Sequence, residues 1–188
     1  MLEEIYQAFL SCNQNVTTDT RKISEGCIFF ALKGPNFNGN KFASDAIQKG
    51  AAYVVIDEEN IKIEDKSFLV QDVLTTLQKL SNYHRRQFEI PVIGITGTNG
   101  KTTTKELIGE VLNANYNTLI TEGNLNNHIG VPLTLLRLNK DHEMAVIEMG
   151  ASKRGDIKEL VEIADPDYGI ITNIAVSYTH LTLPTNHP

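Results

Sequence analysis

Glycines, threonines and a lysine follow one another between residues 94 and 103 in an order that suits phosphate binding. Gly97 and Gly100 allow backbone N–H groups to turn towards anionic oxygens. Lys101 adds a full positive charge for the β- and γ-phosphates of a nucleotide, and Thr102 adds a hydroxyl ligand for Mg²⁺. A helix that starts at Lys101 contributes the partial positive charge of its N-terminus. The run therefore predicts a nucleotide-binding loop.

This loop departs from the standard pattern G-x-x-x-x-G-K-[ST], because Ile95 stands where the first glycine would be. The alternative interpretation is a structural turn between a strand and a helix that contains Gly-Lys-Thr by chance. The residue order and the flanking segments favour nucleotide binding by a variant loop. The residues expected to contact the nucleotide are Gly97, Thr98, Asn99, Gly100, Lys101, Thr102 and Thr103.

Glu148 directly follows the apolar run at residues 145–147, and this position at the end of a predicted strand suits metal binding. A carboxylate at the C-terminal end of a parallel strand lies on the ligand-binding edge of the sheet. Beside a nucleotide it would bind Mg²⁺, which takes one or two carboxylates together with phosphates and waters. An exposed acidic residue at a strand end is the alternative from position alone.

The segment from residue 121 to residue 132 is rich in amide side chains. Asn124, Asn126 and Asn127 can each donate and accept hydrogen bonds, which suits a polar substrate. Turn chemistry accounts for asparagines in a loop as well. His128 is predicted to be a loop residue rather than a metal ligand, because no other histidine has a suitable spacing.

The phosphate-binding loop requires a strand before it and a helix after it, and the surrounding sequence predicts both. Val92–Thr96 is short, apolar and rich in β-branched residues, and a helix is expected from Lys101. Further strands are predicted at residues 118–120, 145–147 and 169–171, with helices near 132–137 and 156–164. Strands that alternate with helices indicate a mostly parallel sheet covered on both faces.

The first 85 residues have a separate α/β pattern. Helices are predicted at residues 1–11, 42–49 and 74–88, and strands at 27–32, 51–56 and 67–70. Residues 17–21 are expected to form a polar turn, and residues 33–40, which are dense in turn formers, a loop. His84 lies on the apolar face of its helix and is predicted to be packed, whereas Arg85 and Arg86 are predicted to be solvated.

Composition excludes several classes of protein. The 188 residues include 17 Lys and Arg against 23 Asp and Glu, a net charge of −6, which argues against sequence-independent nucleic-acid binding. No apolar run approaches the roughly 20 residues that cross a bilayer, and the acidic start at residues 1–4 lacks a secretory pattern. Cys12 and Cys27 are too few for a disulfide framework. We therefore expect a cytoplasmic protein that binds neither nucleic acid nor membranes.

Several motifs in sequence order resemble the Mur ligase family, the amide-forming enzymes of peptidoglycan precursor synthesis. Residues 97–103 look like its ATP-binding signature, and residues 123–134 are similar to the branch that adds D-alanyl-D-alanine. Residues 18–21 and 31–34 match its UDP-sugar-binding domain, although Asn38 and Asn40 stand at usual acidic and histidine positions. The further segments that fit this branch are residues 148–151, 155–157, 166–167 and 171–174.

The resemblance implies an α/β protein with two domains. A small UDP-muramoyl-substrate-binding domain is expected at residues 1–85, and a truncated ATP-binding domain with a P-loop-type, mostly parallel sheet at residues 86–174. Residues 175–188 have no counterpart in the family and are interpreted as a non-native, adapter-like tail. His180 in this tail is accordingly not equated with the family's metal-binding histidine.

The resemblance also implies an ATP- and Mg²⁺-dependent ligase, monomeric at full length, that joins D-alanyl-D-alanine to UDP-N-acetylmuramoyl tripeptide through an acyl phosphate. Lys101 would be catalytic, and Thr102 and Glu148 would bind Mg²⁺. The substrate-binding residues would be Asn124, Asn126 and Asn127 at the muramoyl-peptide end and Thr20, Arg21, Lys33 and Gly34 at the UDP end. This chain alone would be an inactive fragment. The alternatives are a sibling ligase that adds the third stem-peptide residue, a P-loop NTPase and a nucleotide- or UDP-sugar-binding module without ligase activity.

Overall fold

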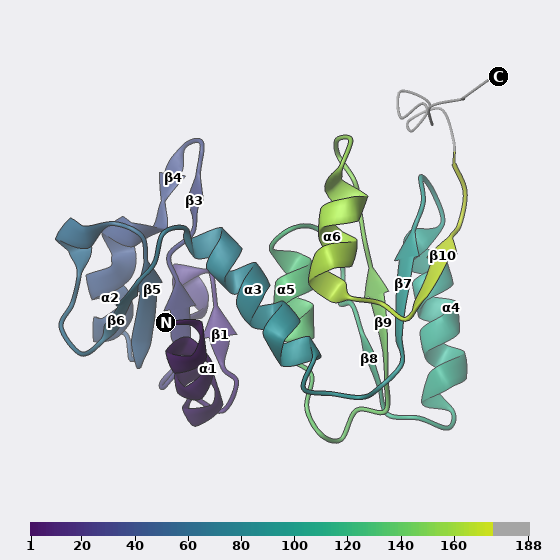
Figure 1. Ribbon diagram of the computed structural model, residues 1–188, viewed down its shortest axis with the longest axis horizontal. Coiled ribbons are helices and arrows are strands. Elements are labelled where there is room, and N and C mark those ends of the chain that lie inside the picture. The colour runs from purple at the N-terminus through teal and green to yellow at the C-terminus, as the bar shows by residue number, and fades with distance from the viewer. Residues whose placement is uncertain (175–188) are drawn as a thin grey trace. The chain divides into compact units, whose positions relative to one another are not determined.

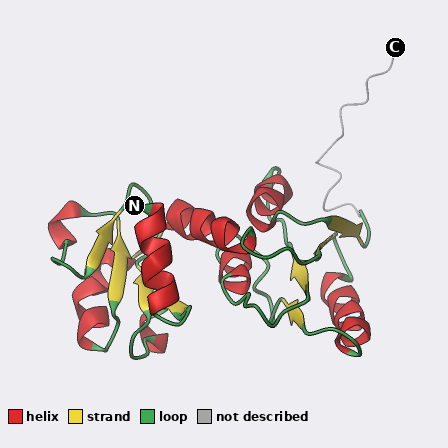
Figure 2. Cartoon of the chain, turned by 60° about the horizontal axis from the view of Figure 1, so that its bottom comes forward, coloured by secondary structure: helices red, strands yellow, loops and turns green. Residues whose placement is uncertain are grey.

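The computed structural model describes residues 1–174 and separates into two compact units, of which the first is Met1–His84 and the second begins at Arg85 (Figure 1). Each unit has its own parallel sheet with helices packed on it, as the strands and helices of Figure 2 show. The α/β class predicted from the sequence is confirmed. The expected tail at residues 175–188 lies outside the described residues.

The first unit is built on a four-stranded parallel sheet with the order β1-β2-β5-β6. Its strands are β1 (Val16–Thr17), β2 (Ile28–Phe30), β5 (Tyr53–Ile56) and β6 (Ser67–Leu69). Its helices are α1 (Leu2–Ser11), α2 (Ala43–Gln48) and α3 (Val73–Arg85), with short 3₁₀ turns η1 (Thr20–Lys22), η2 (Gly39–Phe42) and η3 (Glu59–Ile61). Phe29, Val54 and Ile56 pack with Ala43 and Ala46 of α2 in one buried cluster.

Two short elements of the first unit differ from the sequence prediction. Residues 33–40, expected to be a loop, contain an antiparallel hairpin of β3 (Lys33–Gly34) and β4 (Phe37–Asn38). Residue 17, expected in a polar turn, belongs to β1, which pairs with the buried strand β2. Strands of two residues are too short to give a periodic pattern, so sequence periodicity cannot identify them.

His84 is packed as predicted. Its side chain is fully buried, its Nδ1 lies 3.2 Å from the Tyr6 hydroxyl, and its ring meets that of Phe9 edge to face at 4.9 Å. These contacts fasten α1 to α3.

The second unit has a four-stranded parallel sheet with the order β10-β7-β9-β8. Its strands are β7 (Val92–Thr96), β8 (Thr118–Ile120), β9 (Met144–Glu148) and β10 (Tyr168–Ile171), and its helices are α4 (Lys101–Asn113), α5 (Gly130–Leu135) and α6 (Asp156–Ala164). Helices α5 and α6 share one apolar cluster with alternate residues of β9, while α4 contacts the strands from the other side (Figure 1). Every strand and helix predicted for this unit is present. Among the described residues, none of the helices has the length and apolar character needed to cross a membrane.

Arg85 corrects the sequence prediction, because it is buried rather than solvated. Its guanidinium lies 2.9 Å from a carboxylate oxygen of Asp167 and donates to the carbonyl of Phe88 at 3.0 Å. The same oxygen of Asp167 accepts a hydrogen bond from the N–H of Val92 at 2.8 Å. Asp167 therefore joins the segment that enters β7 to the segment that enters β10, and through them supports the loop that follows β7.

We expect Asp167→Asn to lower the free energy of unfolding of the second unit by about 1–3 kcal/mol, because it deprives a buried guanidinium of its carboxylate. Asp165→Asn is the matched control, since it removes the same charge from an exposed pair with Arg86 and should change stability by less than about 1 kcal/mol. Urea unfolding and hydrogen exchange of the β7 amides measure the stability of both variants. Equal losses in the two variants would contradict the role assigned to Asp167.

Candidate functional site

The predicted phosphate-binding loop occupies residues 97–100, between the end of β7 and the start of α4. Gly97 has a φ of 138° and Gly100 a φ of 80°, and both values lie in the region that glycine favours. A Cβ on Gly97 would also collide with the Thr172 hydroxyl and lie 3.0 Å from the backbone nitrogen of Asn173. Both glycines are therefore required by the path of this loop.

Lys101, the first residue of α4, folds its side chain back over the loop. Its ammonium group donates to the carbonyl of Gly97 at 2.8 Å and lies 3.4 Å from that of Thr98. The N–H groups in the first turn of a helix lack intrahelical acceptors, and the helix dipole adds positive potential there. This end of α4 is consequently suited to an anion such as a nucleotide phosphate.

Residues that follow β10 form hydrogen bonds with the glycine-rich loop. The N–H groups of Thr98 and Asn99 donate to the backbone oxygen and the side-chain oxygen of Asn173, at 3.1 and 2.8 Å. The Thr172 hydroxyl donates to the carbonyl of Asn99 at 2.6 Å. These two N–H groups therefore support the shape of the loop, and the N–H groups in the first turn of α4 are the ones left to face an anion.

Thr102 and Glu148, the two predicted Mg²⁺ ligands, are brought together by the fold. The Thr102 hydroxyl lies 3.3 Å from one carboxylate oxygen of Glu148, which stands at the C-terminal end of β9. Glu148 is only 1% exposed, so the alternative of an exposed acid at a strand end is wrong.

The residues present fit a bound Mg²⁺ ion. Glu148 Oε2 is buried and has no hydrogen-bond partner within residues 1–174, while Oε1 accepts from Thr102 and from the Asn126 amide at 3.3 and 2.8 Å. A hydroxyl and a carboxylate are hard oxygen donors of the kind that Mg²⁺ prefers beside phosphates. Thr102 and Glu148 are the residues that could hold the ion.

Lys105 is a member of this site that the sequence prediction missed. It is fully buried, its ammonium group donates to the carbonyl of Thr121 at 2.7 Å, and it lies 3.8 Å from Glu148 Oε2. Its position one helical turn after Lys101 places both lysines on the same face of α4. Lys105 is also paired with the more exposed Glu106 at 2.9 Å, and its charge at 3.8 Å partly offsets the burial of the Glu148 carboxylate.

The asparagine loop contributes to the site through its own side-chain and backbone contacts. The side-chain amide of Asn126 donates to Glu148, and its backbone carbonyl accepts from the N–H of Gly150 at 2.7 Å. Asn127 accepts from the N–H groups of Ile129 and Gly130 at 3.0 and 2.9 Å, which orders the start of α5. Asn126 thus positions a candidate metal ligand and Asn127 performs turn chemistry. Substrate contacts by Asn124, Asn126 and Asn127 stay predictions.

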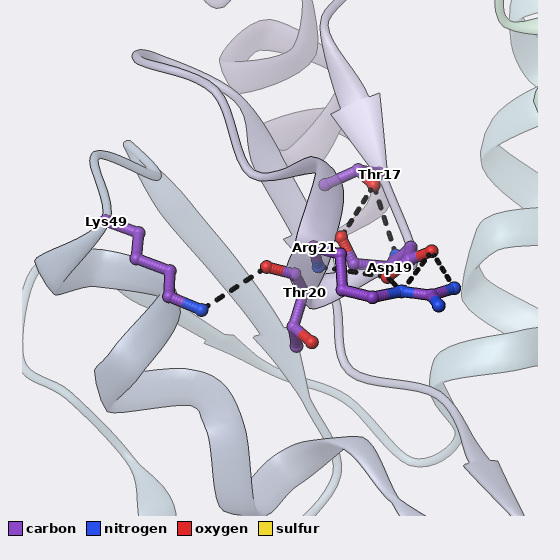
Figure 3. A network of polar contacts seen from close by, with 5 residues as sticks. All are labelled: Thr17, Asp19, Thr20, Arg21 and Lys49. Atoms are coloured by element: carbon purple, nitrogen blue, oxygen red, sulfur yellow. Dashed lines mark hydrogen bonds and ion pairs between the residues drawn. The ribbon is translucent and has the colours of Figure 1, made fainter.

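In the first unit, Arg21 makes a forked pair with Asp19, as Figure 3 shows. Its Nε and Nη2 atoms donate to the carboxylate oxygens at 2.9 and 2.7 Å, and Asp19 also accepts from the backbone N–H of Arg21. The Arg21 side chain and then its backbone N–H hold the pKa of the Asp19 carboxyl far below its ordinary value. Lys49 reaches the carbonyl of Thr20 at 3.5 Å.

Lys33 is surrounded by carboxylates at the base of the β3–β4 hairpin. Its ammonium group lies 2.8 Å from Asp57 and 3.2 Å from Glu58, and the hydrogen bond with Asp57 is the main reason why the pKa of Lys33 is raised. The amide of Asn38 donates to Glu58 and that of Asn40 to Asp57, each at 2.8 Å. The structure thus groups Lys33 with these two asparagines, but no described contact joins that group to Arg21.

Comparison with known proteins gives matches in both units. Residues 14–98 match the family described as Mur ligase family, catalytic domain, and residues 95–182 match the Mur ligase middle domain. The second match extends beyond residue 174, where the predicted middle domain ends.

Two relatives named UDP-N-acetylmuramoyl-tripeptide–D-alanyl-D-alanine ligase are each 44% identical to this chain. The Synechocystis protein aligns over 89% of this chain and 37% of its own length, and the Bacillus subtilis protein over 87% and 36%. A crystal structure of MurF ligase from Thermotoga maritima in complex with ADP has a TM-score of 0.78 and 35% identity, over 86% of this chain and 38% of that one. The chain therefore spans less than two-fifths of each of these relatives.

We expect Arg21→Gln to raise the pKa of Asp19 towards its ordinary value of 3.8, because the guanidinium that favours the ionised form is removed. A carboxyl titration by NMR measures this change, and Arg86→Gln should leave Asp19 unaffected. A folded-state pKa below the unfolded one makes the pair stabilising above about pH 4, and that contribution is lost as the pH falls through the folded-state pKa. An unchanged titration of Asp19 in Arg21→Gln would contradict the pairing.

Lys105→Met should weaken Mg²⁺-dependent binding of ATP by about tenfold or more, because groups that orient a metal ligand typically have effects of this size. Isothermal titration with ATP, in Mg²⁺ and again in EDTA, separates the loss of metal binding from misfolding. Lys158→Met is the matched control, since that lysine is exposed on α6. Affinities that fall equally with and without Mg²⁺ would show that Lys105 does not act through Glu148.

Proposed function

Because this chain belongs to the Mur ligase family and carries its N-terminal and middle domains, we propose that it is the substrate- and nucleotide-binding part of a UDP-N-acetylmuramoyl-tripeptide–D-alanyl-D-alanine ligase. The observation that carries the proposal is the pairing of Thr102 with Glu148 beside a glycine-rich loop at the start of α4. The names of the relatives from Synechocystis and Bacillus subtilis support the choice of branch.

In the proposed reaction, the γ-phosphate of ATP is transferred to the terminal carboxylate of the muramoyl tripeptide, which forms an acyl phosphate and ADP. The amine of D-alanyl-D-alanine then attacks the acyl carbon, the amide bond forms, and phosphate leaves. The protein's part in the first step is positioning and neutralisation of charge. Lys101 would exchange its two carbonyl contacts in the loop for phosphate oxygens and so stabilise the transferring group.

Thr102 and Glu148 would hold Mg²⁺, which neutralises charge on the β- and γ-phosphates when bound. Lys105 and Asn126 contribute indirectly, because they fix the carboxylate of Glu148 from two sides, at 3.8 and 2.8 Å. The first-turn N–H groups of α4 would complete the binding of the phosphates. These proposed contacts support a role for this unit in positioning and charge neutralisation during phosphoryl transfer.

The first unit would bind the UDP end of the substrate. Arg21, whose side chain is 87% exposed, and Lys33 are the proposed cationic contacts for the diphosphate. To bind it, Arg21 would exchange its contacts with Asp19 for phosphate oxygens, and Lys33 those with Asp57 and Glu58. Thr20 and Gly34 lie next to them in sequence and are proposed as further contacts. Asn124, Asn126 and Asn127 would orient the muramoyl-peptide end, where amides can both donate and accept.

The proposed localisation and partners follow from the reaction. ATP and a nucleotide-linked precursor favour the cytoplasm, and no nucleic acid or membrane takes part. We propose a monomeric full-length enzyme. The competing functions are a sibling ligase that adds the third stem-peptide residue, an NTPase without an amino acceptor, and a binding module that consumes no ATP. The choice of acceptor and the consumption of ATP distinguish them.

The test uses a hybrid protein in which residues 1–174 of this chain are fused to the remaining part of the Bacillus subtilis relative. The hybrid should consume ATP only when a UDP-muramoyl tripeptide and D-alanyl-D-alanine are both present. Lys101→Ala should lower its rate by about 100-fold or more, because a charge at the γ-phosphate is lost, whereas Lys158→Ala should have no effect. Phosphate release and mass spectrometry of the product measure these outcomes.

Three results would count against the proposal. Joining of a single amino acid to a UDP-muramoyl dipeptide with equal or better efficiency would indicate the sibling ligase. Release of phosphate that does not depend on either acceptor would indicate an NTPase. Near-normal turnover by Lys101→Ala would contradict the proposal that the loop at residues 97–103 binds the nucleotide.

A further inference from the structure

Three potential metal ligands converge away from the phosphate-binding loop. His128 lies just before α5, while Asp156 and Glu159 lie three residues apart in the first turn of α6 and so share one helix face. The Nε2 atom of His128 is 2.8 Å from Glu159 Oε2 and 3.9 Å from Asp156 Oδ1. One ligand atom from each of the three residues lies within 4.8 Å of the other two.

Asp156 is the buried member of this group, with 4% of its surface exposed. Its Oδ2 accepts from the N–H groups of Ser152 and Lys153 at 2.7 and 2.9 Å, and these bonds lower the pKa of the carboxyl. Its Oδ1 is buried, points towards His128 and has no hydrogen-bond partner among the described residues. A buried carboxylate oxygen without a donor is costly, and a cation at this point would satisfy it.

We propose that His128, Asp156 and Glu159 form a binding site for a divalent transition-metal ion of the Zn²⁺ type. One imidazole and two carboxylates are a donor set that Zn²⁺ accepts. Bond lengths of about 2.0–2.2 Å in a tetrahedral site place the ligand atoms about 3.3–3.6 Å apart. The distances of 2.8 and 3.9 Å lie on either side of this range, so each needs to change by only about half an ångström.

The site has an entrance and an open coordination position. The side chain of Glu159 is 55% exposed and that of His128 is 25% exposed, so an ion can enter from the solvent side while Asp156 forms the floor. Three protein ligands leave a fourth position of a tetrahedral ion for water. This donor set shares no residue with Thr102 and Glu148, and the site is therefore separate from the proposed Mg²⁺ position.

A bound ion would connect the asparagine loop to α6. His128 directly follows Asn127, whose side chain orders the start of α5, and Asp156 begins α6. The ion would thus restrain the loop that carries Asn126 and, through it, the surroundings of Glu148. This inference does not rest on the proposed ligase activity, because metal binding can be measured without any substrate.

The experiment titrates Zn²⁺ alone into the 188-residue chain after treatment with EDTA and buffer exchange. We expect one equivalent to bind, and His128→Asn and Glu159→Gln each to weaken binding at least tenfold. Glu162→Gln is the matched control, because it removes the same charge from another exposed position of α6 and should bind as the unaltered chain does. The double variant His180→Asn/His187→Asn should also bind normally, which excludes the histidines near the C-terminus.

Co²⁺ provides an independent readout, because its visible absorption becomes intense in a four-coordinate site and stays weak in an octahedral, mostly hydrated one. The unaltered chain should give the intense spectrum, and His128→Asn should lose it while keeping its thermal midpoint in EDTA. Absence of stoichiometric Zn²⁺ binding would overturn the proposal. So would unchanged Zn²⁺ affinity in His128→Asn, or a weak Co²⁺ spectrum typical of a hydrated ion.

Discussion

A carboxylate buried at the end of a central strand must be surrounded by donors and positive charge, and the second unit is organised around this requirement for Glu148. Removing such a group from water costs several kcal/mol unless it is paired and hydrogen-bonded. Thr102 and Lys105 approach it from α4, and Asn126 approaches it from the loop before α5. Even its backbone N–H is used, since it donates to the Thr121 hydroxyl at 2.9 Å. A charge of this kind therefore defines the relative positions of a strand, a helix and a loop.

The parallel register places that charge beside the glycine-rich loop. Ile95 of β7 pairs with Glu148 of β9, and on the other side of β7 Thr96 pairs with Ile171 of β10. The carboxyl ends of three neighbouring strands thus meet at one edge of the sheet, where ligands of such folds bind. The loop at residues 97–100 leaves the middle one, so it is flanked by Glu148 on one side and by Thr172 on the other.

The sequence predicts the elements of the second unit well, because Val92–Thr96 and Thr118–Ile120 are buried strands with a dense apolar pattern. The two residues predicted as Mg²⁺ ligands, Thr102 and Glu148, lie 3.3 Å apart in the structure, while metal binding by them stays a prediction. Prediction from the sequence fails where the decisive partner is remote. The carboxylate that pairs with Arg85 lies 82 residues later, and Lys105 is polar by type but buried by its neighbours. The approach of His128 to Asp156 and Glu159 could not be predicted from the sequence either, because these residues become neighbours only when α6 packs beside α5.

The hydrogen bonds between the glycine-rich loop and Asn173 have a consequence for the order of folding. Asn99 and Asn173 are 74 residues apart, and closing so long a segment costs chain entropy that local contacts do not repay. The turn between β7 and α4 is local, yet its final shape depends on residues 172 and 173, which follow β10 much later in the sequence. A chain in which β10 has not yet docked would therefore present a loop without its lateral support. If the loop binds phosphate as proposed, tight binding would then be a late event in the folding of this unit.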